Sequence, residues 1–112
     1  MKQLYILLLA LFFGLSACQT KIEHAKSISV HIKGNCNMCK ETIESAGSKS
    51  GISKVEWDKK SKMALITFDE KQSNPRKILR SIADAGYENA YFKAKASAYR
   101  KLPKCCHYKS SK

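Results

Sequence analysis

The stretch that decides the fold reads SISVHIKGNCNMCKETIESAG, from residue 27 to residue 47. Polar residues in its first third alternate with three apolar ones, Ile28, Val30 and Ile32. This period of two predicts a half-buried strand. The pair Gly34-Asn35 ends the alternation and begins a loop. From Cys39 to about Lys49 the sequence predicts a helix, which Gly51 stops. We therefore interpret the stretch as a strand, a loop with two cysteines and a helix.

The next part of the chain supplies four further elements. Segments from about Ser53 to Asp58 and from Met63 to Phe68 are predicted strands, and the polar turn between them indicates a hairpin. Ser73 or Asn74 can cap a second helix, and Pro75 suits its first position. The apolar stripe of this helix consists of Ile78, Leu79, Ile82 and Ala83. The segment Ala90–Lys95 fits a fourth strand.

The order strand, helix, strand, strand, helix, strand indicates an α+β fold of the ferredoxin-like βαββαβ type. We expect a four-stranded antiparallel sheet with two helices on one face, because that arrangement buries the apolar stripes of both helices. Trp57 and Phe68 are expected in the core. The domain would span residues 27–95, and the chain length suits one such core.

The N-terminus has the pattern of a secretory signal over residues 1–17. A short basic start is followed by an apolar run, Leu4–Leu15, and then by small residues. The run is shorter than the roughly 20 residues that span a bilayer, although an uncleaved short anchor is an alternative. Leu15-Ser16-Ala17-Cys18 resembles the lipobox of bacterial lipoproteins. That resemblance implies cleavage before Cys18, lipid on this residue, and a lipid-anchored tether over residues 18–26.

The charge of the chain is strongly positive. It has 21 Lys and Arg against 9 Asp and Glu, a formal net charge of +12. Such a balance indicates nucleic acid or an anionic surface as a partner. Export argues against nucleic acid, so we expect a membrane surface in the cell envelope, beside the lipid anchor. No catalytic triad, carboxylate pair or phosphate loop stands out, and we predict no enzyme.

The spacing of Cys36 and Cys39 carries the chemistry. A two-residue gap lets both sulfurs converge on one ion, and the free N–H groups of a helix N-terminus stabilise thiolates. Thiolates select soft metal ions. We therefore predict Cys36 and Cys39 as metal ligands. Met38, between them, lies near the site but is expected to fill space rather than bind.

Two alternatives use the same cysteines. A thiol–disulfide protein would use Cys36 as nucleophile and Cys39 as resolving thiol. The element order is wrong for a thioredoxin fold, and neither Pro75 nor Pro103 stands before a strand that could face the thiols. An inert disulfide between Cys36 and Cys39 would close so small a loop that it would constrain little of the unfolded chain.

Residues 27–95 resemble the heavy-metal-associated domain family, which includes copper chaperones and periplasmic mercuric-ion-binding proteins. The resemblance lies in the Cys36–Cys39 motif, in Thr42-Ile43-Glu44 and in the late stretch Ile82–Tyr87. It implies metal on Cys36 and Cys39, with Tyr87 beside the site. It implies Cu(I) first and Hg(II) or Zn(II) second, for metal delivery, buffering or detoxification with a metal-transporting membrane protein as partner. The loop departs from the family's Gly-Met-x-Cys-x-x-Cys, because Gly34-Asn35-Cys36 lacks the Met and is one residue shorter.

The basic tail, residues 96–112, contains Cys105, Cys106 and His107. Vicinal cysteines rarely bond to each other, because a disulfide requires a specific separation and dihedral angle. These three side chains are candidate additional ligands, provided that the tail doubles back to the loop end of the domain. Pro103 and the preceding residues Tyr99–Leu102 could make that turn and pack on the domain. The tail could instead bind a second ion alone, crosslink a partner or carry an incidental pair. The lone histidines, His24 and His31, are expected at the surface.

Overall fold

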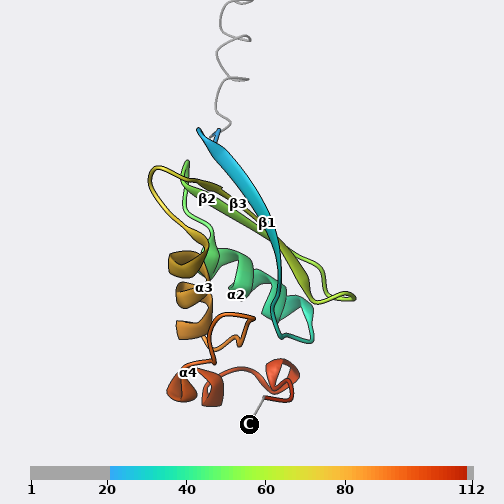
Figure 1. Ribbon diagram of the computed structural model, residues 1–112. Coiled ribbons are helices and arrows are strands. Elements are labelled where there is room, and N and C mark those ends of the chain that lie inside the picture. Colours follow the sequence, from blue (N-terminus) through green and yellow to red (C-terminus); the bar gives the residue numbers. More distant parts are fainter. Residues whose placement is uncertain (1–20, 111–112) are drawn as a thin grey trace, which may run out of the picture.

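The computed structural model describes residues 21–110, so the predicted signal and the predicted lipid attachment at Cys18 lie outside the described residues. The described chain has an α+β fold (Figure 1). Its strands are β1 (Ala25–His31), β2 (Ser53–Trp57) and β3 (Met63–Asp69). Its helices are α2 (Asn37–Gly47), α3 (Pro75–Asp84), the short α4 (Ala96–Arg100) and the 3₁₀ helix η1 (Lys104–Cys106).

The strands form one antiparallel sheet in the order β1-β3-β2, which includes the predicted β2–β3 hairpin. Val30 lies opposite Ala64, and Val55 lies opposite Ile66. The buried apolar side chains of all three strands therefore share one face. The helices α2 and α3 cover that face (Figure 1), whereas Leu65 is 44% exposed on the other.

The core lies between the sheet and these two helices. Its largest fully buried apolar side chains are Trp57, Tyr87, Ile32, Ile43, Ile66, Leu79 and Ile82. Trp57 and Phe68 are 1% and 5% exposed, which confirms their predicted place in the core. The stripe of the second helix is buried as the 3.6-residue period predicted.

Both helices begin where local chemistry favours it. The helix α3 has Asn74 as its N-cap, whose Oδ1 accepts a hydrogen bond from the backbone N–H of Lys77 at 3.0 Å. Pro75 follows at the start of the helix, as predicted. The helix α2 begins at Asn37, two residues earlier than predicted, with Cys36 as its N-cap.

The prediction of a fourth strand is wrong, because residues 90–95 form no strand. The side chain of Asn89 explains the difference. Its Oδ1 accepts hydrogen bonds from the backbone N–H groups of Tyr91 (3.0 Å) and Phe92 (3.1 Å). Donors held in this turn cannot join a strand ladder. A single bridge between Ile32 and Asn89 remains, so the chain after α3 still passes along the outer edge of β1.

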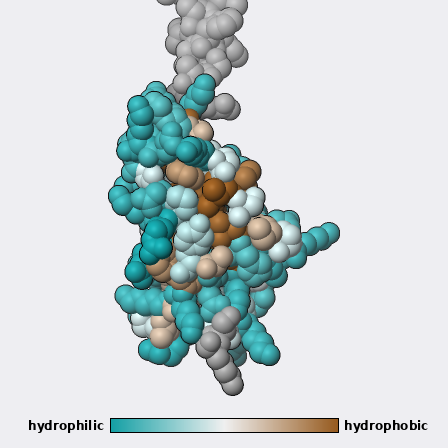
Figure 2. Space-filling model, in the orientation of Figure 1, coloured by the Kyte–Doolittle hydropathy of each residue, from teal (hydrophilic) through white to brown (hydrophobic). Residues whose placement is uncertain are grey.

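The tail doubles back towards the loop end of the sheet. In Figure 1, α4 and η1 lie beyond the end at which β1 stops and α2 begins, opposite the end at which β1 starts. The surface is largely hydrophilic, with a hydrophobic patch near the middle of the visible face (Figure 2). His24 and His31 are exposed, as predicted. Within residues 21–110, no helix has the length and apolar character needed to cross a bilayer.

Candidate metal centre

The Cys-x-x-Cys loop joins β1 to α2 and is supported by Trp57. The Nε1 of Trp57 donates a hydrogen bond to the carbonyl of Ile32 at 2.9 Å. A Cβ on Gly34 would lie 3.0 Å from the Trp57 ring and 3.2 Å from the Cβ of Cys39. Any side chain at this position would therefore push the loop away from the ring. This close approach holds the loop against the sheet.

Cys36 and Cys39 lie at the first turn of α2. Their Sγ atoms are 3.3 Å apart. The backbone N–H of Asn35 points at the Cys39 sulfur, with a nitrogen–sulfur distance of 3.4 Å. Together with the positive end of the helix dipole, such donors favour thiolates. The two sulfurs therefore converge, as their spacing indicated.

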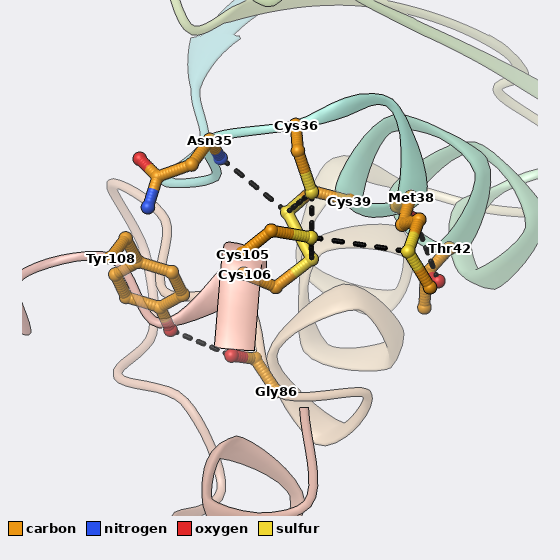
Figure 3. Close-up of a disulfide and its surroundings, with 9 residues drawn as sticks. All are labelled: Asn35, Cys36, Met38, Cys39, Thr42, Gly86, Cys105, Cys106 and Tyr108. Atoms are coloured by element: carbon orange, nitrogen blue, oxygen red, sulfur yellow. Dashed lines mark hydrogen bonds between the residues drawn. A yellow bond between two sulfur atoms is a disulfide. The ribbon is translucent and has the colours of Figure 1, made fainter. Parts of the chain in front are cut away.

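The tail brings a third sulfur to this pair. Cys106 forms a disulfide with Cys39, and its Sγ lies 3.3 Å from that of Cys36 (Figure 3). Among the described residues, Cys36, Cys39 and Cys106 form a group of side chains that could hold one metal ion. Their sulfur atoms all lie within 4.8 Å of one another. Cys39 and Cys106 are fully buried, whereas Cys36 is half-buried.

The other candidate ligands lie outside this group. The Sγ of Cys105 is 3.9 Å from that of Cys106 and 3.9 Å from the Sδ of Met38, and both Cys105 and Met38 are exposed. His107 stacks on the ring of Tyr99, with 5.3 Å between the ring centroids. Of the three tail residues singled out in the sequence, the structure thus brings only Cys106 into the cluster.

Tyr108 anchors the tail beside the site. Its hydroxyl donates a hydrogen bond to the carbonyl of Gly86 at 2.6 Å and accepts one from the backbone N–H of Glu88 at 2.9 Å. The Tyr99 hydroxyl donates to the carbonyl of Tyr108 at 2.6 Å. A Cβ on Gly86 would lie only 3.1 Å from the side chain of Leu102. The tail is therefore held by contacts that do not involve sulfur.

The two free thiols differ in acidity. Burial opposes ionisation of Cys36, but a hydrogen bond with the Cys105 side chain and the backbone N–H groups of Cys39 and Met38 hold its pKa below the ordinary value. The same contact with Cys36 raises the pKa of Cys105. Cys36 is therefore the member of this pair that ionises first.

Tyr87 is more buried than the sequence indicated. It was expected beside the site, and its side chain is fully buried. Burial raises the pKa of its phenol, and the neighbouring Cys36 and Cys105 act in the same direction. Its hydroxyl makes no hydrogen bond to any described residue. The ring of Tyr87 also stacks on that of Tyr108, with 6.2 Å between the ring centroids, so Tyr87 supports the docked tail.

Tyr99 and Leu102 pack against the core, as expected from the sequence, whereas sequence analysis missed the role of Tyr108 in docking the tail. A signal was present, because two tyrosines and a leucine flank the cysteines in an otherwise basic segment. Buried tyrosines usually find a hydrogen-bond partner for the hydroxyl, and these two do.

Comparison with known proteins gives one consistent group of relatives. A mercuric transport protein periplasmic component from Pseudomonas aeruginosa is 30% identical over 67 residues, covering 58% of this chain and 74% of the relative. The Shigella flexneri protein of the same name is 31% identical over the same shares. The one from Shewanella putrefaciens is 39% identical over 54 residues, covering 47% of this chain and 59% of the relative. No protein-family model and no solved structure matches the chain significantly.

Proposed function

Because the chain belongs to the family of periplasmic components of mercuric transport, we propose that it binds Hg(II) through Cys36 and Cys39 in the cell envelope. The single observation that supports this most is the convergence of the two sulfurs, 3.3 Å apart at the start of α2. Thiolates are soft ligands and suit a soft ion. The names of the relatives put Hg(II) ahead of Cu(I), which the sequence analysis had placed first.

The proposed task is capture and delivery. Cys36 is half-buried and its pKa is lowered, so it is the thiolate that an incoming ion meets first. Cys39 lies deeper and completes the pair. Transfer to a membrane transporter would proceed by ligand exchange, in which a thiolate of the acceptor bonds to Hg(II) as the bond to Cys36 breaks. No electron changes hands in this step.

The position of the site suits such a transfer. The start of α2, where Cys36 and Cys39 lie, is at the opposite end of the sheet from the start of β1 (Figure 1). If Cys18 carries the predicted lipid, the tether enters the domain at the end remote from the site. The site would then face away from its own anchor, and its half-buried member, Cys36, would be the one that a partner reaches. The positive charge of the chain would favour contact with an anionic membrane surface.

The redox alternative finds no support in the pairing of the cysteines. A Cys36/Cys39 dithiol protein would oxidise to a bond within the Cys-x-x-Cys motif, whereas the disulfide joins Cys39 to Cys106. The relatives are named as transport proteins. We therefore develop the metal-transport function alone.

The test is a competition among metals. The reduced full chain is mixed in mild detergent with equal amounts of Hg(II), Cu(I) and Zn(II), and bound metal is identified by native mass spectrometry. We expect one Hg(II) per chain. The double variant Cys36→Ser/Cys39→Ser should lose this adduct and keep its circular dichroism spectrum, because serine is close to cysteine in size and so preserves the packing around the fully buried Cys39. If the double variant binds as much Hg(II) as the original chain does, the proposal is wrong.

A further inference from the structure

We propose that the Hg(II) site contains a third thiolate, Cys106, which the docked C-terminal tail places against the Cys-x-x-Cys pair. This inference rests on the proposed function and adds a ligand that the Cys-x-x-Cys motif does not contain. It assigns the tail a task, which is to complete and cover the site.

The first argument is geometric. The Cys106 sulfur is bonded to that of Cys39 and lies 3.3 Å from that of Cys36. Thiolates bound at about 2.3 Å to a common ion lie roughly 4 Å apart. When the disulfide is reduced, the sulfurs of Cys39 and Cys106 can move apart from bonding distance. Their distances to the Cys36 sulfur, each 3.3 Å, then need to grow only slightly for an ion to sit between the three. Figure 3 shows all three pointing into the same space between α2 and η1.

The second argument is that the tail does not depend on the disulfide for its position. Tyr108 is 5% exposed, and its hydroxyl is hydrogen-bonded to the backbone carbonyl of Gly86 and the backbone N–H of Glu88. The Nζ of Lys33 also donates to the carbonyl of Lys109 at 3.2 Å, on the far side of η1. These contacts are made by residues that closely follow Cys106 in the sequence, and they involve no sulfur, so they remain when the disulfide is reduced. Cys106 is therefore presented to the pair before any ion arrives, which lowers the entropic cost of binding.

The third argument concerns charge and solvent. Three thiolates around a divalent ion leave one net negative charge, which needs a favourable environment when two of the sulfurs are buried. The N-terminus of α2, with Cys36 as its N-cap, directs the positive end of the helix dipole at this position. Cys36 is the one half-buried member of the three, so exchange with an outside thiolate is directed to it.

The disulfide is the oxidised, metal-free form of the same cluster. Its reduction consumes two electrons and two protons, which a dithiol reductant supplies while it forms its own disulfide. The three thiols then release their protons as Hg(II) binds. The cluster therefore accepts metal only after reduction of the Cys39–Cys106 bond.

The experiment counts sulfur neighbours around bound mercury. The full chain is reduced with a dithiol, freed of reductant without air, loaded with one equivalent of mercuric chloride and measured by X-ray absorption. We expect three sulfurs per mercury. Cys106→Ser should bind one Hg(II) with two sulfurs, and Cys106→Ala should do the same if the fold persists by circular dichroism. The matched control is Cys105→Ser, which removes the adjacent exposed thiol and should leave the count at three.

Each outcome separates the two proposals. Two sulfurs in the original chain overturn the three-thiolate site and leave the proposed function intact. An equal fall in the number of sulfur neighbours in Cys105→Ser and Cys106→Ser also overturns it, because the third sulfur would then not come specifically from Cys106. Failure of the original chain to hold any Hg(II) against a monothiol contradicts the proposed function itself.

Discussion

Removing one oxygen from Tyr108 tests how the tail is held. In Tyr108→Phe, the buried carbonyl of Gly86 and the buried N–H of Glu88 both lose the partner that the hydroxyl provides. An orphaned buried backbone group costs about 1–3 kcal/mol. Because relaxation and water recover part of that cost, we expect a loss of about 2–3 kcal/mol in the free energy of tail docking.

The effect is measured in the reduced protein, where no disulfide holds the tail. A loss of this size raises the population of the open tail about 30- to 150-fold. The Cys106 thiol, which is fully buried when docked, should be alkylated faster by the same factor. Burial raises the pKa of Tyr108 to about 12, so its hydroxyl stays protonated across the pH range of the assay.

The control is Tyr91→Phe, which removes a hydroxyl from a side chain that is 48% exposed. Its alkylation rate should match that of the original chain within about twofold, since surface substitutions usually have small effects. If Tyr108→Phe also stays within twofold, the hydrogen bonds of Tyr108 do not position the tail. The second argument for a three-thiolate site would then be wrong.

Three further outcomes are expected elsewhere in the molecule. Gly47→Ala should lower the free energy of unfolding, measured in urea, by about 1–3 kcal/mol, because the added Cβ would lie 2.6 Å from the Val55 side chain. An unchanged free energy of unfolding would contradict the tight packing of α2 on β2. Hydrogen bonding by Gln72 lowers the pKa of Asp69, so its contribution to stability is present above about pH 4 and is lost as the pH falls through the folded pKa. Asp69→Asn should therefore flatten the acid side of the curve of melting temperature against pH, and a curve of unaltered slope would refute this. Cys18→Ser should release the chain from membranes or leave an uncleaved precursor, and failure of the original chain to incorporate a labelled fatty acid would count against the anchor.

Local signals in the sequence predicted most of the fold. The alternation over Ile28–Ile32, the polar turn of the hairpin and the cap at Asn74 each act over a few residues, and each element appears close to its predicted bounds. The fourth strand failed for an equally local reason. The side chain of Asn89 accepts hydrogen bonds from two backbone N–H groups, and the apolar pattern of the following residues gives no sign of this turn.

Only part of the site could be predicted from the sequence. The spacing of Cys36 and Cys39 places both sulfurs together because they lie on one turn of helix. The approach of Cys106 depends instead on packing between segments far apart in the chain, above all the docking of Tyr108 between Gly86 and Glu88. No periodicity encodes such a contact. The sequence could name three tail candidates, and the fold distinguishes Cys106 among them.

The measurement that tests the central claim most directly is retention of Hg(II) against a competing thiol. The reduced full chain and the Cys36→Ser/Cys39→Ser variant are each loaded with one equivalent of mercuric chloride and dialysed against excess glutathione. The account predicts that the original chain keeps its mercury while the variant loses it. Equal loss from both proteins would contradict a mercury site built on Cys36 and Cys39.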